Sequence, residues 1–124
     1  MFDISKEGNI QLIRGDTLSL ALFINQGNEL VPSRYILGDN DEVYFALMEP
    51  NQLFENAILK KVFTKDTAEF TDDGDLVITL YPSDTENLLE GQYIYTIKLR
   101  TTNLDTNREE VRTVVTEHQF SIMN

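Results

Sequence analysis

The chain has 124 residues, 41% of them hydrophobic and 25% charged, and its formal net charge is −11. This length and composition fit one globular domain around a single core, so we expect residues 1–124 to form one domain. So acidic a chain is not expected to bind nucleic-acid phosphates or anionic membranes unaided, and the absence of cysteine excludes disulfides and thiolate chemistry.

The first segment, MFDISKEGNIQLIRG, has no basic region followed by an apolar one, so we expect no signal peptide. The longest apolar run extends only from Leu20 to Ile24, which is far shorter than a membrane span. We therefore expect no transmembrane segment either.

The tripeptide Arg14-Gly15-Asp16 is one by which some proteins bind cell-surface adhesion receptors. A receptor-binding copy has to project from a mobile loop tip, whereas Ile13 and Leu18 flank this one with strand-like apolar residues. Gly15 suits a turn, and the Asp16 carboxylate can accept backbone N–H groups as a strand begins. We interpret the tripeptide as the turn that starts a strand.

Alternating apolar and polar residues predict half-buried antiparallel strands at 17–25, 42–48, 75–81 and 92–100. The segments 57–63 and 111–123 are also strand-like, but their alternation changes parity. In the second, a β-bulge near Val114-Val115, or two separate short strands, would reconcile the two parities. All six glycines and all three prolines fall between these runs, so the pattern predicts a β-sandwich or barrel.

One helical element is expected between two of these strands. Ser83-Asp84-Thr85-Glu86 matches a capping box, in which the first hydroxyl and the last carboxylate satisfy opposite amides. Pro82 would end the preceding strand, Leu88-Leu89 would point to the core, and Gly91 would cap the C-terminal end. We expect one or two turns of helix around Asp84-Leu89.

The sequence contains no motif typical of a catalytic site. With one histidine, His118, a triad or a His-rich metal site cannot be built within one chain. We expect His118 to be a hydrogen-bonded residue near the end of a sheet. No enzyme activity, catalytic residue or cofactor is therefore expected.

Two acidic clusters, Asp39-Asn40-Asp41-Glu42 and Asp72-Asp73-Gly74-Asp75, have oxygen ligands of the kind that calcium prefers. Neither fits the spacing of an EF-hand loop, so we interpret both as solvated turns and predict no metal site. Tyr44 and Tyr81 are off the inward parity, and together they would form a sugar-stacking face. Such a face is the basis of an alternative function, a carbohydrate-binding or adhesive β-sandwich module.

The stretches IRGDTLSLALFI, EVYFALMEP, DLVITLYPSDTENLLEGQYIYTIKL and EHQFSIM resemble a family of immunoglobulin-like β-sandwich domains. These are structural domains of phages and prophages of Gram-positive bacteria, found in baseplate, tail and related virion proteins. The shared motifs are the strand entry Gly15-Asp16-Thr17, then Asp84-Thr85, a leucine at Leu88 or Leu89, Gly91 and Tyr93. The last part is also similar to the tyrosine corner of immunoglobulin domains, with Leu89 in place of an Asp and Tyr95 in place of the Cys.

The resemblance implies an immunoglobulin-like antiparallel β-sandwich of about seven to eight strands with one short helix. It implies no enzyme activity, no cofactor and no transferable site residues. The implied function is structural: a protein that assembles with copies of itself and with other virion proteins, in the host cytoplasm, until lysis releases the particle. Nucleic acid and membrane are not expected partners, and a glycan is one only under the alternative.

An open sandwich has edge strands, and the expected edges are 57–63, with Lys60 and Lys61, and 111–123 with its change of parity. Lysines and bulges oppose indiscriminate edge pairing. We therefore expect specific, face-directed association into a closed homo-oligomer. Because the chain is acidic, its interface must bury apolar area or pair basic residues with acidic ones.

Overall fold

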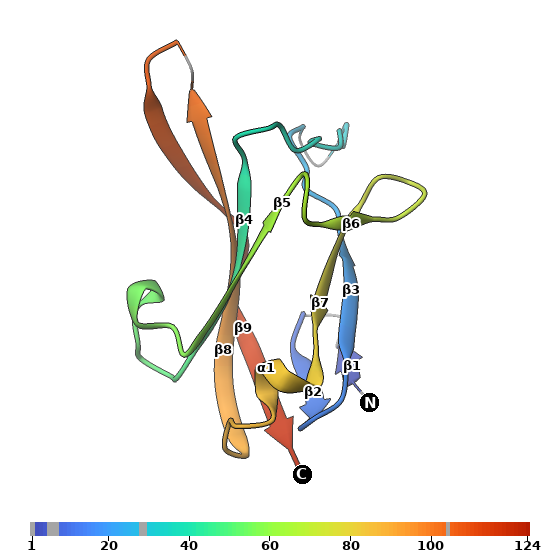
Figure 1. The fold of residues 1–124 in the computed structure, drawn as a ribbon, viewed down its shortest axis with the longest axis vertical. Coiled ribbons are helices and arrows are strands. Elements are labelled where there is room, and N and C mark those ends of the chain that lie inside the picture. Colours follow the sequence, from blue (N-terminus) through green and yellow to red (C-terminus); the bar gives the residue numbers. More distant parts are fainter. Residues whose placement is uncertain (1, 5–7, 28–29, 104) are drawn as a thin grey trace.

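The computed structural model describes residues 2–4, 8–27, 30–103 and 105–124, and these residues form a two-layer β-sandwich (Figure 1). Its strands are β1 (Phe2–Ile4), β2 (Ile10–Ile13), β3 (Leu18–Leu22), β4 (Glu42–Met48), β5 (Leu59–Thr64), β6 (Glu69–Phe70), β7 (Leu76–Leu80), β8 (Gly91–Asn103) and β9 (Arg108–Met123). Two short helical segments, the 3₁₀ turn η1 (Phe54–Asn56) and α1 (Pro82–Thr85), complete the described elements. The predicted all-β sandwich is confirmed.

The larger sheet has the order β1-β2-β9-β8-β4-β5, and the smaller has the order β3-β7-β6. One pair departs from the expected antiparallel arrangement, because β2 runs parallel to the end of β9. This difference follows from the crossover after β2, which takes the chain directly from the large sheet to the small one.

The core lies between the sheets and draws its side chains from the predicted alternation. On β4, Val43, Phe45 and Leu47 are fully buried, while Tyr44 between them is half-buried on the opposite face. The inward residues of β7 and β8 are likewise buried, namely Leu76, Ile78, Leu80, Tyr93, Tyr95, Ile97 and Leu99. At the centre the Phe45 ring stacks on Tyr95 at 5.6 Å, and Phe120 meets both rings edge-on. The alternation was therefore a correct guide to the buried face.

Two register shifts interrupt the pairing of β9 with β8. Tyr95 pairs with His118, Ile97 with Val115 and Lys98 with Thr113, so β9 has an extra residue on each side of Val115. The bulge predicted near Val114-Val115 is confirmed, and β9 is one continuous strand.

The helix differs from its prediction in both ends and in its cap. Pro82 is the first helical residue of α1, since its fixed φ and missing N–H suit that position. Tyr81 is the N-cap residue, and its N–H donates to the Asp84 carboxylate at 2.7 Å. The Ser83-Asp84-Thr85-Glu86 capping box is therefore wrong, because the cap lies two residues earlier.

The segment after α1 returns the chain to the large sheet. Leu88 packs against the core as predicted, but Leu89 is 77% exposed, and Gly91 begins β8 instead of capping the helix. The Tyr93 hydroxyl donates to the Leu89 carbonyl at 2.7 Å, which is the hydrogen bond of a tyrosine corner. This contact ties the start of β8 to the segment after α1.

Beyond the end of β4, β8 and β9 continue as a two-stranded ribbon. We define the arm as this ribbon, residues 101–103 and 105–110, together with residues 111–113 of β9, which pair with residues 98–100 of β8. The β4–β8 pairing ends at Arg100, and β2 pairs with β9 only from Phe120 onward. In the described part of the chain, residues 101–103 pair only with 108–110, and residues 111–113 have β8 on one side and no strand on the other. Figure 1 shows the arm projecting from the end of the sandwich opposite α1.

The expected edges are confirmed in part. Among the described strands, β5 pairs only with β4, so it is an edge of the large sheet as predicted. β9 is an inner strand where β2 covers it, and an edge along the arm. The predicted edge at 111–123 is therefore correct only for its first part.

Candidate functional site

The tripeptide Arg14-Gly15-Asp16 forms the turn by which the chain crosses between the sheets. The Asp16 N–H donates to the Ile13 carbonyl at 3.0 Å, and Gly15 has a φ of +87°, as a type II turn requires. The Arg14 guanidinium donates to the Leu88 carbonyl at 3.2 Å. The predicted turn is confirmed, and its arginine holds the crossover against the segment after α1.

The two acidic clusters contribute to hydrogen bonds and ion pairs within the fold. Asp41 is buried, and its carboxylate accepts the Tyr35 hydroxyl at 2.5 Å and the Gly38 N–H at 2.7 Å. Other members form the ion pairs Asp39–Lys65, Glu42–Arg100 and Arg34–Asp75. In the ranges that the structure describes, no group of three or more His, Asp or Glu side chains could hold a metal ion.

The two tyrosines on which the alternative sugar-stacking face depends are not brought together. On β4, Tyr44 and Phe45 point to opposite faces of the large sheet, and Phe45 pairs with Lys61. The Tyr81 ring lies 5.0 Å from the Lys61 ammonium, on the Phe45 face. Tyr44 and Tyr81 therefore lie on opposite faces of one sheet, and the platform that they were expected to build does not form.

His118 lies within the β8–β9 ladder, beside the second register shift, where it pairs with Tyr95. Its Nδ1 atom is 2.6 Å from the Thr116 carbonyl oxygen, and its ring is 6.0 Å from that of Tyr95. The predicted hydrogen bond of His118 is thus confirmed, but the residue lies within the ladder and not at the sheet's end.

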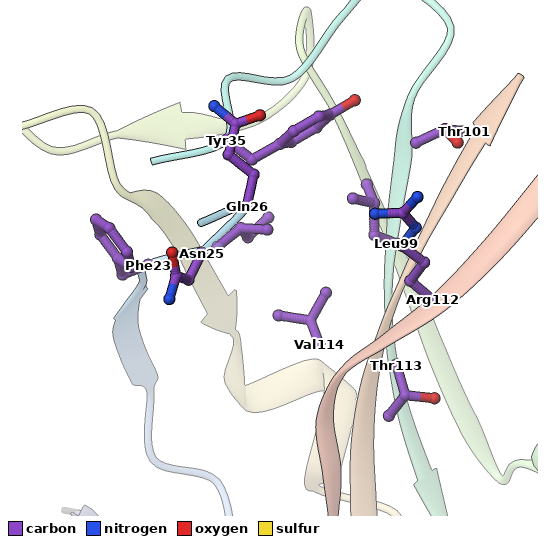
Figure 2. Close-up of a pocket in the computed structure, with 10 residues that line it drawn as sticks. Phe23, Asn25, Gln26, Tyr35, Leu99, Thr101, Arg112, Thr113 and Val114 are labelled. Carbon is purple, nitrogen blue, oxygen red and sulfur yellow. The ribbon is translucent and has the colours of Figure 1, made fainter. Parts of the chain in front are cut away.

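A cavity of about 330 Å³ opens between the two sheets at the end from which the arm projects. It is lined by Phe23, Ile24, Asn25, Gln26, Tyr35, Leu99, Thr101, Arg112, Thr113 and Val114. Figure 2 shows Arg112 and Val114 of β9 on one side of it and Asn25 on the other. We call this end of the sandwich, with the cavity and the arm, the open end.

The polar groups of the cavity are amide, hydroxyl and guanidinium side chains. Burial, and then the Asp41 carboxylate that accepts its hydrogen bond, raise the pKa of Tyr35 to about 12, so its hydroxyl stays neutral. Arg112 is the cation at the mouth, and its guanidinium lies 3.5 Å from Glu110. The described lining contains no imidazole, thiol or carboxylate that could act as a base beside a nucleophile.

A second hollow, of about 320 Å³, lies beside the first and is lined by Arg34, Ile36, Leu37, Lys65, Phe70, Asp73 and Gly74. The Arg34 guanidinium stacks 5.0 Å from the Phe23 ring, which also lines the first cavity. Ile36 is 80% exposed and Phe70 is 42% exposed. Exposed apolar side chains therefore continue across the open end from one hollow to the other.

The cavity was not predicted from the sequence, although one signal in the sequence indicated it. The bulge at Val114 shifts the parity of β9 and places Arg112 opposite Leu99, on the inward face. A charged residue on that face indicates that the two sheets separate there, because a closed core would not accept it. Phe23, Ile24 and Asn25 come from the end of the predicted strand 17–25, and Tyr35 comes from a segment without periodicity.

Comparison of the chain with protein-family models, with characterised proteins and with solved structures gave no match. Among the described helices, none is long and apolar enough to cross a membrane. What the open end does is therefore inferred from its own geometry and from the motifs of the sequence.

Proposed function

We propose that this protein is a non-catalytic structural or assembly component of a phage or prophage virion, in the baseplate, tail or associated with the capsid. It acts through protein–protein interfaces at its open end. The observation that carries this proposal is the arm, a two-stranded extension with an unpaired outer edge in the described part of the fold. The virion setting is supported by the motifs Gly15-Asp16-Thr17 and Asp84-Thr85 through Tyr93.

The arm contributes nothing to the core of its own chain. Each of its side chains for which burial is described is exposed or half-buried, and Val111 is 60% exposed. A two-stranded ribbon of this kind is marginally stable in water on its own. A second chain that covers the arm would supply the hydrogen bonds and apolar contacts that it lacks, which is the behaviour expected of an assembly element.

The loops at the open end add an exposed apolar surface. Its members are Phe23, Leu30, Val31, Ile36 and Phe70, with exposed fractions from 40% to 93%. Exposed apolar patches on soluble domains commonly mark interaction sites. The same end of an immunoglobulin variable domain presents its binding loops, so this geometry is a known use of the fold, by analogy alone.

The experiment asks whether the chain is part of a particle. Particles released by lysis of the cells that encode the chain would be banded by density, and mass spectrometry would measure the amount of this protein relative to the major capsid or tail protein. A fixed stoichiometry in the particle band supports the proposal. Absence from the band, together with binding of the purified protein to an immobilised glycan, would replace it with the carbohydrate-binding alternative.

A further inference from the structure

We infer, as a consequence that rests on the proposed assembly function, that two copies of this chain pair edge to edge along β9. The strands run antiparallel, and the two-fold axis passes through Val111. The paired stretch is Glu109–Thr113, in which Glu109 lies opposite Thr113, and it joins two large sheets into one. This edge pairing takes the place of the face-directed association that the sequence led us to expect.

The first support is that the outer edge of the arm is regular over this stretch. From Arg108 to Thr113 the register with β8 is unbroken, and the shifts begin at the next residue, Val114. On the outer side, β2 covers β9 only from Phe120 onward. The described fold thus leaves a straight six-residue edge, and the bulges stop any pairing from extending along the strand.

The second support is the order of charges along this edge. A two-fold axis through one residue places that residue opposite itself and its two neighbours opposite each other. With the axis at Val111, valine meets valine, and Glu110 meets Arg112 on both sides of the axis. The exposed Val111 side chains become covered, and two opposite-charge pairs form.

Other centres in the same stretch are disfavoured. An axis through Arg108, Glu109, Glu110 or Arg112 would place a charge directly opposite its own copy. An axis through Thr113 would draw the bulged Val114 into the ladder. Val111 is therefore the centre that avoids both conflicts.

The charged side chains are already placed for this pairing. Glu110 and Arg112 lie two residues apart on one face of β9, and their side chains are 55% and 74% exposed. Their charged groups are 3.5 Å apart within one chain. A second copy would therefore complete a network of four charges without moving the strand.

The other long edge of the large sheet lacks this self-complementarity. On β5, Lys60 and Lys61 stand side by side, and Lys61 is held by the Asp84 carboxylate at 2.8 Å. Lysines on an edge discourage pairing with copies. The contrast favours β9 as the edge that pairs.

The test uses charge reversal with rescue. Sedimentation of the full chain from micromolar to millimolar concentration should show a monomer–dimer equilibrium. Glu110→Arg places arginine opposite Arg112, and Arg112→Glu places glutamate opposite Glu110, so each should raise the dimer Kd by at least about tenfold. Glu117→Arg, an exposed reversal on β9 within the second register shift and outside the paired stretch, is the matched control and should leave the Kd within about twofold.

Rescue then separates pairing from general damage. The double variant Glu110→Arg/Arg112→Glu restores opposite charges, and so does an equimolar mixture of the two single variants, which should form a heterodimer. A dimer whose Kd is unchanged in both single variants would overturn the edge pairing. Failure of the two single variants to associate when they are mixed would also overturn it. So would a monomer at all concentrations, although the particle test of the proposed function would still stand. Conversely, if opposite charges restore the dimer but the particle band contains none of this protein, the edge pairing is supported and the proposed virion function is overturned.

Discussion

The two ends of this sandwich use the same strands in opposite ways. At the closed end, around α1 and the Arg14-Gly15-Asp16 turn, the connections between sheets are held by hydrogen bonds. Arg14 donates to the Leu88 and Met123 carbonyls, and Tyr93 donates to the Leu89 carbonyl. At the open end the sheets separate around a cavity, and β8 and β9 continue past their neighbours.

The difference shows which end of the fold contains the stabilising packed core and which end exposes apolar surface. The aromatic cluster of Phe45, Tyr95 and Phe120 is completely packed, since its members are at most 5% exposed. The open end instead has exposed apolar loops and an unpaired edge in the described residues. A well-packed closed end can support an open end that binds partners. This difference in packing between the two ends can be tested by mutation.

The largest effect is expected from truncating the packed cluster. Phe120→Ala should lower the free energy of unfolding by about 3–5 kcal/mol, because the fully buried ring leaves a cavity between Phe45 and Tyr95. Val114→Ala, at the existing cavity, should cost about 1 kcal/mol or less. Urea denaturation of both variants measures the two losses. Equal losses would mean that the ends do not differ in packing.

A pH effect should identify the polar anchor of the open end. The pKa of Tyr35 is raised from 10.0 to about 12 in the folded chain, so folding favours its neutral form. The stability that this shift contributes is fully present below pH 10 and is lost as pH rises from 10 to 12. The difference in unfolding free energy between the wild type and Tyr35→Phe should shrink over this range. Parallel pH profiles for the two proteins would contradict the Tyr35–Asp41 contact.

The crossover turn offers a test of backbone conformation alone. Gly15 has a positive φ, and a Cβ built there meets no atom within 4 Å, so Gly15→Ala should cost about 1 kcal/mol through conformational strain. Gly15→Asn should cost less, because asparagine tolerates positive φ better. Urea midpoints of the two variants give the comparison. An alanine variant as stable as the wild type would show that the turn does not require this conformation.

The smallest of these effects concerns the tyrosine corner. Tyr93→Phe removes the hydroxyl that donates to the Leu89 carbonyl and should cost about 1 kcal/mol. Tyr81→Phe is the matched control, because that residue is 54% exposed, and its stability should change by less than about 0.5 kcal/mol. The melting temperatures of both variants, measured in the same buffer, compare the two losses of stability. Equal decreases in melting temperature would mean that the tyrosine-corner hydrogen bond does not stabilise the closed end.

The fold was predictable wherever one face of a strand is buried and the other is not. Leu76, Ile78 and Leu80 are buried as their alternation indicated, since a slip of one residue would expose the whole set. The parity change in 111–123 predicted a bulge for the same reason. The turn at Gly15 was predictable because the glycine lies between two strand-like runs.

The helix cap, the exposure of Leu89 and the cavity depend on contacts between side chains and backbone groups that the local sequence pattern does not indicate. Ser83 resembles an N-cap, but Pro82 fixes an earlier start for α1 and Asp84 satisfies the Tyr81 amide. Leu89 is apolar yet exposed, because only its carbonyl is needed by Tyr93. The cavity requires Tyr35 to fold back beside β9, and no periodicity in 31–41 signals that return.

Amide hydrogen exchange at two protein concentrations tests most directly the claim that the open end is completed by a second copy. In dilute solution, the amides of Glu109–Thr113 that point away from β8 should exchange rapidly, while Val43–Leu47 of β4 should be protected. At millimolar concentration the outward amides of the arm should slow, and the β4 amides should not change. Exchange of the arm that is independent of concentration, or a slowing that spreads evenly over the whole chain, would contradict it.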